Sequence, residues 1–225
     1  MTGLELVGEG RTADVYALDG DRVLRRYRDG KDVGTEAAVM AHVRAHGFPA
    51  PAVHHASGPD LVLDRLTGPT LLSALTTGDS TTHEAAAVLA GLHTTLHALP
   101  PAGHPHPVAP GDTVVHLDLH PDNVVLTDDG PVLIDWRNAT DGPAGLDIAY
   151  SALILAQVAV DPAADLGPLA DALVGPFLEA AGGAPLDHLE AATARRGRDP
   201  QMTTTELEQL ATAAALVARR ALELP

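Results

Sequence analysis

The sequence predicts an α+β fold in which a small lobe built on a sheet precedes a mainly helical lobe. Short strand-like segments separated by turns fill the first 66 residues. From Leu71 onward, apolar residues instead recur at helical spacing. A length of 225 residues suits one large domain or two small lobes that share a cleft. We therefore expect a first domain over 1–66 and a second over 67–225.

Five strands and one helix are expected in the first lobe. Asp19-Gly20 is a strong hairpin signal between the second and third strands. A helical pattern over Val33–Ala45 follows, and Gly47 and Pro49 end it. The five expected strands are Leu4–Val7, Asp14–Leu18, Val23–Tyr27, Val53–Ser57 and Leu61–Asp64.

The second lobe begins with a helix that Thr81 and Glu84 open as a capping box and that Pro100 ends. A hairpin then pairs Val124–Leu126 with Val132–Ile134. The expected later helices are Leu146–Val160, Ala163–Ala181 and Thr204–Leu222, the last opened by a second capping box of Thr203 and Glu206.

Composition narrows the possible partners. The 30 acidic and 14 basic residues give a formal charge of −16, which repels nucleic acid and anionic membranes and allows a cationic partner. The chain has no cysteine, so disulfides and cysteine-bound zinc are excluded. The opening MTGLELVGEG lacks the features of a secretory signal, and the longest apolar run, Ile148–Val160, is too short to span a bilayer. We expect a cytoplasmic protein.

The most informative segment runs from His116 to Asn123. Asp118 and Asn123 lie five residues apart on a loop that Pro121 keeps from being helical, and the following hairpin delivers Asp135 at the end of an apolar strand. Alone, each of these residues is typical of a turn. In this order and spacing they favour phosphoryl transfer, which needs one carboxylate for the attacking hydroxyl, and an amide and a second carboxylate for Mg²⁺.

The H-x-D-x-x-x-x-N loop followed by I-D-W resembles the aminoglycoside phosphotransferase and kinase-like family, whose fold is the bilobal one of protein kinases. The resemblance implies that Asp118 is the catalytic base and that Asn123 and Asp135 bind Mg²⁺. It also implies that His116 is a structural histidine, and that Asp147, at the next helix start, supports the loop.

The first lobe is expected to hold the nucleotide. Gly8 and Gly10 form a turn where backbone amides can approach phosphates. The family carries a lysine where this chain has Arg25, whose expected ion-pair partner is Glu36. Three hypotheses follow: Arg25 replaces the lysine, Lys31 reaches in from its loop, or strong catalysis is lost. We favour the first, because arginines outnumber lysines 13 to 1 in this chain.

Leu61–Gly68 resembles the strand and hinge that join the two lobes in this family. The resemblance implies that backbone groups from Asp64 to Leu66 meet the adenine and that the nucleotide is ATP.

Histidines are a second candidate for chemistry. His93 and His97 lie four apart on one expected helix, a zinc-compatible spacing, but no glutamate completes an H-E-x-x-H motif. We interpret them as surface or half-buried residues. His120, inside the loop, is expected to help position Asp118 or the substrate. Solvated loop positions are expected for His54, His55, His104 and His106.

Acidic residues do not mark a cation site. Residues 1–136 carry a net charge of −10 and residues 137–225 carry −6, so acid is not concentrated in the second lobe. The unranked candidates there are Asp141, Asp161, Asp165, Glu179, Asp187 and Glu190.

The sequence thus predicts an ATP- and Mg²⁺-dependent O-phosphotransferase acting on a small-molecule hydroxyl of aminoglycoside, sugar or amino-alcohol type. The alternative is a nucleotide-binding, pseudokinase-like regulator, which only Arg25 favours. Trp136 after Asp135, and the lack of an A-P-E motif, disfavour a protein kinase.

Overall fold

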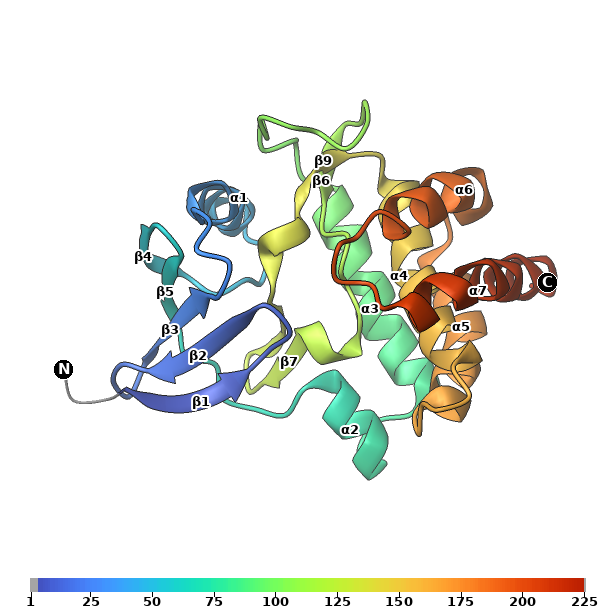
Figure 1. Cartoon of the computed structure of the whole chain (residues 1–225), viewed down its shortest axis with the longest axis horizontal. Coiled ribbons are helices and arrows are strands. Elements are labelled where there is room, and N and C mark those ends of the chain that lie inside the picture. The colour runs from blue at the N-terminus through green and yellow to red at the C-terminus, as the bar shows by residue number, and fades with distance from the viewer. Residues whose placement is uncertain (1–3, 225) are drawn as a thin grey trace.

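A five-stranded antiparallel sheet forms the first lobe of the computed structural model, which describes residues 4–224. Figure 1 shows this sheet at one end of the molecule and the helices α3 to α7 at the other. The strand order is β1-β2-β3-β5-β4, and the expected five-stranded sheet is confirmed. Its strands are β1 (Glu5–Glu9), β2 (Ala13–Ala17), β3 (Arg22–Tyr27), β4 (Val53–Ser57) and β5 (Asp60–Asp64). The expectation that the chain has no secretory signal used the segment MTGLELVGEG. Residues 1–3 of that segment lie outside the described residues.

The central strand β3 carries Arg25 into the middle of the sheet. The Asp19-Gly20 turn sets the register of the hairpin, in which Arg25 stands opposite Val15 of β2 and Leu61 of β5. Side chains alternate between the two faces of a strand. Arg25 is therefore half-buried on one face, while Arg26 on the other pairs with Asp60 in the open.

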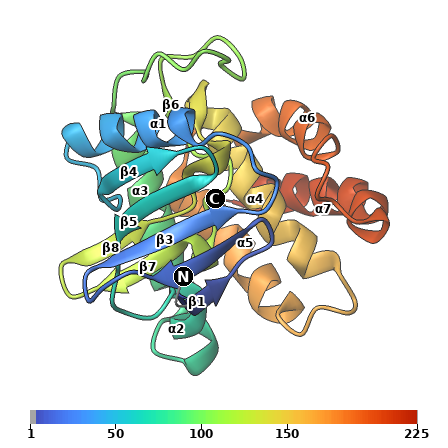
Figure 2. The same cartoon turned by 60° about the vertical axis from the view of Figure 1, so that its left-hand side comes forward.

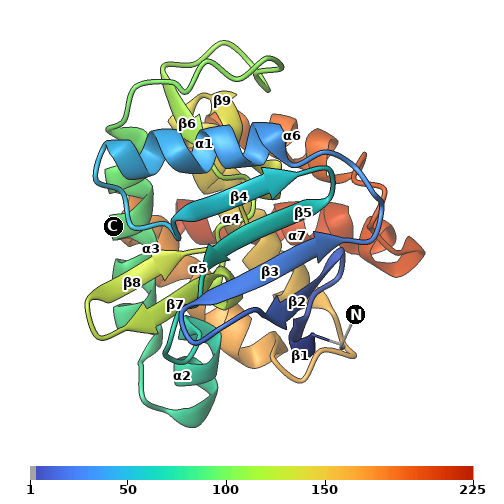
Figure 3. The same ribbon diagram turned by 90° about the vertical axis from the view of Figure 1, so that its left-hand side faces the viewer.

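Helix α1 (Gly34–Ala45) is the one helix of the first lobe, as expected. It packs beside β4, and Figure 3 shows it lying along that edge of the sheet. Val39, Met40 and Val43 form its buried face. Gly47 follows in the left-handed region with φ 84°, which ends the helix at little steric cost.

The second lobe is built around one buried helix, α4. Its residues from Leu146 to Gln157 are buried on every side, and it packs against α5, α6 and α7. Figure 2 shows α6 and α7 beside the sheet, at the right of the view. The helices of this lobe are α2 (Leu71–Thr77), α3 (Thr82–His97), α4 (Ala144–Val160), α5 (Gly167–Ala181), α6 (Pro185–Arg196) and α7 (Thr204–Leu222). Within residues 4–224, no helix has both the length and the apolar character needed to cross a membrane.

Both capping boxes expected from the sequence are present. Thr81 accepts a hydrogen bond from the backbone N–H of Glu84, whose side chain accepts one from the Thr81 backbone. Thr203 and Glu206 make the same pair of bonds at the start of α7. These short-range contacts explain why both helix starts could be predicted.

Several elements differ from the expectation, and the first is α2, a separate short helix that precedes the helix expected to open the second lobe. The helix predicted from Ala163 begins at Gly167, because the Asp161 carboxylate accepts from the Ala163 backbone and holds a turn there. Helix α6 was not predicted, since half of its residues are polar or charged and only Pro185, Leu189 and Ala192 are buried. A two-stranded sheet of β6 (Thr113–Val115) and β9 (Thr140–Gly142) was also missed, because its short strands pair far along the chain.

A hairpin and a buried indole link the two lobes. The predicted hairpin is β7 (Val124–Thr127) and β8 (Gly130–Leu133), and the backbone N–H of Leu133 donates to the carbonyl of Pro49 in the first lobe. Trp136 follows this hairpin and is fully buried. Its ring meets Phe48 edge to face at 5.5 Å and His116 at 4.9 Å between centroids.

Candidate active site

The loop after β6 is fixed by the amide of Asn123. A short 3-10 helix, η1 (Pro121–Asn123), turns the chain so that Asn123 Nδ2 lies 2.9 Å from the carbonyl oxygen of Asp118 and 3.1 Å from His120 Nε2. Asn123 Nδ2 is also 3.4 Å from the Asp118 carboxylate. With its NH₂ group directed at the loop, Asn123 retains its amide oxygen as an acceptor.

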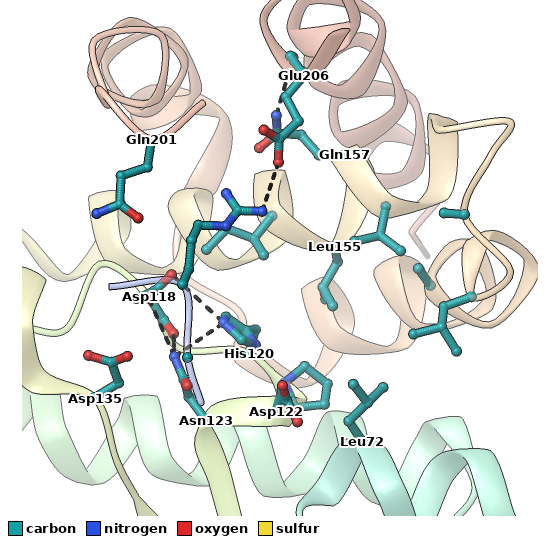
Figure 4. A pocket seen from close by; sticks show the side chains of 18 of the residues that line it. Leu72, Asp118, His120, Asp122, Asn123, Asp135, Leu155, Gln157, Gln201 and Glu206 are labelled. Atoms are coloured by element: carbon teal, nitrogen blue, oxygen red, sulfur yellow. Dashed lines mark hydrogen bonds and ion pairs between the residues drawn. The ribbon is translucent and has the colours of Figure 1, made fainter. Parts of the chain in front are cut away.

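The next segment brings Asp135 to the same place. The backbone N–H of Ile134 donates to the Asn123 carbonyl at 2.9 Å, which ties the end of the hairpin to the loop. Asp135 itself has φ 62°, an uncommon conformation for a residue with a side chain. Asp118, Asn123 and Asp135 all line one pocket, and Figure 4 shows their side chains close together.

Arg25 reaches this group from the sheet. Its Nη2 lies 2.6 Å from Asp135 Oδ1, and its Nη1 lies 3.6 Å from Glu36 Oε1 on α1. The expected ion pair with Glu36 is thus present, but the shorter contact is with Asp135. The Tyr27 hydroxyl donates to the Glu36 carboxylate at 2.8 Å, and the Arg25 guanidinium lies 4.8 Å from the centre of the Tyr27 ring.

Burial and the neighbouring positive charge have opposite effects on the pKa values of Asp135 and Glu36. Burial acts to raise the pKa of Asp135, but the charge and hydrogen bond of Arg25 outweigh it, so that pKa lies below its ordinary value. Burial raises the pKa of Glu36, and the neighbouring Arg25 and Tyr27 only partly offset the rise. Asp135 is therefore held as an anion at the pocket.

Asp147 supports the loop from below. Its carboxylate accepts from the backbone N–H of His116 at 3.0 Å and of Leu117 at 2.7 Å. This geometry agrees with the role that the resemblance implies. His97 Nε2 and His93 Nδ1 lie 3.0 and 3.4 Å from the same carboxylate.

The interpretation of His93 as a surface or half-buried residue is therefore wrong: it is buried, while His97 is half-buried. Both project from α3 toward α4, and His93 Nε2 also contacts the Ser151 hydroxyl at 3.0 Å. His93, His97 and Asp147 together form the kind of cluster that could bind zinc. The carboxylate of Asp147, however, already accepts hydrogen bonds from two backbone N–H groups. The contact with Asp147 could not be predicted from the spacing of His93 and His97, because Asp147 lies on another helix.

His116 is buried, as a structural histidine should be. Neither of its ring nitrogens has a hydrogen-bond partner among the described residues. Burial lowers its pKa, so the ring is neutral and acts as an apolar face against Trp136.

A pocket of about 540 Å³ contains most of the predicted site. Gly10, Arg25, Asp118, Asn123 and Asp135 line it. Gly8, Glu36, Asp64 and Leu66 are not among its lining residues.

The predicted residues outside the pocket have other positions. Glu36 lies behind Arg25. The Asp64 carboxylate accepts from the Ala52 backbone N–H at 2.8 Å and contacts His54 Nε2 at 2.8 Å. His54 is thus half of a surface pair rather than simply solvated. The hinge hypothesis concerned backbone groups and stays a prediction.

Among the acidic candidates of the second lobe, only Asp161 lines the pocket. Asp141 is buried, and its carboxylate accepts from the backbone N–H groups of Ala102 and His104. The search missed Asp199 and Glu206, which do line the pocket. From the sequence, Glu206 could be recognised only as a helix cap. The capping-box pattern indicates a bond to a residue three positions away, but it does not indicate that the side chain also faces the pocket.

Comparison with solved structures identifies the fold. A choline/ethanolamine kinase family protein from Mesorhizobium loti has a TM-score of 0.62 at 16% identity, with 100% of this chain and 90% of that chain covered. A thermostable mutant of aminoglycoside phosphotransferase APH(4)-Ia, in ternary complex with ADP and hygromycin B, has a TM-score of 0.60 at 16% identity, with 98% and 94% covered. The expected protein-kinase-like bilobal fold is confirmed.

Sequence comparisons also identify a kinase and a phosphotransferase family. A thiamine kinase of Salmonella paratyphi B is 45% identical over 56 residues, which is 24% of this chain and 19% of the kinase, so the match spans about a fifth of that relative's length. The family model of the phosphotransferase enzyme family matches residues 3–112 and 79–200, most of the chain. The chain therefore belongs to the phosphotransferase enzyme family.

Proposed function

We propose that this chain is an ATP- and Mg²⁺-dependent O-phosphotransferase that acts on the hydroxyl of a small molecule. The observation that carries the proposal is that Asp118, Asn123, Asp135 and Arg25 line a single pocket between the lobes. Phosphoryl transfer depends on positioning and on charge stabilisation, and these four side chains supply both. In this proposal residues 1–66 bind the nucleotide and residues 67–225 carry catalysis and the acceptor.

Asp118 is the proposed catalytic base. The acceptor oxygen attacks the γ-phosphorus, the bond from that phosphorus to the bridging oxygen breaks, and ADP leaves with that oxygen. The proton of the acceptor hydroxyl passes to the Asp118 carboxylate. Asn123 restrains this residue through its backbone carbonyl, which supports the assignment.

The remaining oxygens fit Mg²⁺. Asn123 retains its amide oxygen, and Asp135 retains Oδ2 while Oδ1 contacts Arg25. Mg²⁺ in nucleotide sites takes one or two protein oxygens plus phosphates, so Asn123 and Asp135 would hold it. When bound, Mg²⁺ supplies charge neutralisation at the phosphates.

The nucleotide contacts come from the first lobe. Arg25 is the proposed phosphate ligand, since a guanidinium can bind phosphate oxygens bidentately. Glu36 would orient it, and the turn at Gly8 and Gly10 would bring backbone amides to the phosphates. Backbone groups from Asp64 to Leu66 are the proposed adenine contacts.

The compounds named for the relatives support an alcohol as the acceptor, but they do not favour one particular alcohol. Choline, ethanolamine, thiamine and hygromycin B all carry alcohol groups. The acceptor of this chain is therefore assigned here only as a small-molecule alcohol.

The contact between Arg25 and Asp135 favours a second candidate, a nucleotide-binding regulator with little turnover, because it occupies an oxygen of a proposed Mg²⁺ ligand. The two candidates differ in one measurable property: only the transferase releases ADP in response to an acceptor.

The test is ADP production from Mg-ATP with pooled alcohols: aminoglycosides, sugars, amino alcohols and nucleosides. Asp118→Asn should lower acceptor-dependent turnover by at least about a hundredfold, the usual contribution of a positioned base. Asp128→Asn, at an exposed position in the turn between β7 and β8 and outside the pocket lining, is the matched control and should retain most activity. Nucleotide binding by calorimetry with no turnover from any pool would support the regulator instead.

A further inference from the structure

The pocket continues past the reacting groups to a wall of apolar side chains. We define this apolar wall by six lining residues from helices α2, α4 and α5: Leu72, Leu75, Leu155, Val158, Leu169 and Leu173. In Figure 4 Asp135 lies at one side of the pocket, and Leu72 and Leu155 lie toward the other. An acceptor whose hydroxyl reaches Asp118 would thus rest its remaining atoms against hydrocarbon.

On the polar side of the pocket, two carboxylates already contact guanidinium groups. Arg11 Nη2 lies 3.3 Å from Glu206 Oε1, and Arg196 Nη1 lies 3.9 Å from Asp199 Oδ2. Arg196 also donates to the Gln157 side chain at 2.7 Å. These two guanidinium groups reduce the attraction that Glu206 and Asp199 would exert on a substrate with several positive charges.

We infer that the acceptor is an alcohol carried on an apolar body, uncharged or with a single positive charge, and not a polycation. The inference rests on the proposed function and narrows its acceptor. The apolar wall supplies binding free energy by removing hydrocarbon from water. Asp122 is exposed and Asp161 is half-buried, so either can balance one cation only weakly. The acceptor body must also be small, because the nucleotide shares the same 540 Å³ pocket.

Two series of alcohols test this inference, each with a constant head and a growing alkyl chain. The uncharged series is methyl, butyl and hexyl β-D-glucoside. The singly charged series is N-alkyl-N,N-dimethylethanolammonium with the same chains, and gentamicin is the polycation. Dissociation constants are measured by calorimetry on the full chain with Mg²⁺ and the non-hydrolysable nucleotide AMP-PNP present.

In at least one series the dissociation constant should fall about threefold for each added methylene. Gentamicin should bind at least about tenfold more weakly than the hexyl member of that series.

Two wall variants connect the effect to this site. Leu72→Gln and Leu169→Gln alter half-exposed positions of the apolar wall and should reduce the gain from methyl to hexyl by about tenfold. Leu186→Gln, on an exposed leucine of α6 outside the pocket, is the matched control and should leave the gain unchanged. Unaltered AMP-PNP affinity shows that each variant is folded.

Three results would overturn the inference: no chain-length dependence in either series, tighter binding of gentamicin, or an equal loss in the Leu186→Gln control. Failure of the proposed function would look different. In that case Mg-AMP-PNP would not bind, or no alcohol would produce ADP in an Asp118-dependent way, whatever the ranking of the acceptors.

Discussion

Arg25 connects the sheet to the catalytic loop. Its guanidinium lies between Asp135 and Glu36, where most lysines could reach only one of the two at a time. The opposite charges around it raise the pKa of Arg25 despite its burial, so it is always a cation. A phosphate that binds this guanidinium must compete with Asp135 for it.

Replacing Arg25 should therefore weaken nucleotide binding. We expect Arg25→Ala to raise the dissociation constant of Mg-AMP-PNP by about tenfold or more, the usual worth of a charge-assisted hydrogen bond. Lys31→Ala should change it by less than about twofold, because Lys31 is exposed and pairs only weakly with Asp29. Arg26→Ala, on the other face of β3, is the matched control. Calorimetry that ranks Lys31→Ala above Arg25→Ala would refute the assignment.

Among residues 4–224, two residues other than glycine hold left-handed backbone conformations, and both adjoin the site. Leu117 has φ 58° and Asp135 has φ 62°. Such conformations cost of the order of 1–3 kcal/mol and persist only where the surroundings enforce them. Here the Asp147 carboxylate holds the Leu117 N–H, and Arg25 holds the Asp135 side chain. The strain lies where the proposed base and Mg²⁺ ligand must be oriented.

At the scale of elements, Asp147 joins α3, α4 and the catalytic loop. Burial acts to raise its pKa, but the hydrogen bonds and charges of His93 and His97 outweigh burial, and the pKa lies well below its ordinary value. Because the unfolded chain binds a proton at Asp147 more readily than the folded chain, this residue stabilises the fold above the ordinary pKa of 3.8. The contribution is lost as the pH falls toward the depressed, folded value.

Asp147→Asn should lower the free energy of unfolding at pH 7 by about 3 kcal/mol, because a buried carboxylate with several donors is removed. The difference from the parent protein should shrink as the pH is lowered below 3.8. Urea unfolding followed by Trp136 fluorescence measures both quantities. Asp187→Asn, at an exposed position of α6, is the control. A loss that stays constant with pH would contradict the role of the charge.

At the scale of the whole molecule, two surface ion pairs join the lobes. Arg11, at the turn between β1 and β2, contacts Glu206 at the start of α7. Arg137 donates to Asp29 at 2.7 Å beside the sheet. Arg11 and Glu206 both line the pocket, so their contact crosses between the proposed nucleotide side and the acceptor side.

The pair of Arg11 and Glu206 should be weak and therefore easily opened. Their side chains are 61% and 26% exposed, and pairs of this kind are worth less than about 1 kcal/mol. We expect a double-mutant cycle of Arg11→Gln and Glu206→Gln to give a coupling energy in that range, falling toward zero at about 1 M salt. Glutamine can also complete a capping box, so Glu206→Gln removes the charge and keeps the helix cap. The cycle therefore measures the interaction between the two charges and not the loss of the cap. A coupling above about 2 kcal/mol would show instead that the lobes are locked together.

Local patterns accounted for much of the fold. Thr81 and Thr203 cap their helices through residues three positions away, and the Asp19-Gly20 turn sets its own hairpin. Such bonds form within one turn, so their sequence signature is sufficient. The spacing of Asp118, Asn123 and Asp135 likewise placed three side chains that line one pocket, because a short loop and one hairpin connect them.

Neighbours along the chain account for the helix caps, the Asp19-Gly20 hairpin and the grouping of Asp118, Asn123 and Asp135, so these features could be predicted from the sequence. Three other features follow from packing between distant segments: Arg25 pairs more closely with Asp135 than with Glu36, His93 is buried against Asp147, and an apolar wall continues the pocket. Those contacts join segments tens of residues apart. They depend on how the helices and the sheet pack against one another, and no pattern of neighbouring residues indicates this packing.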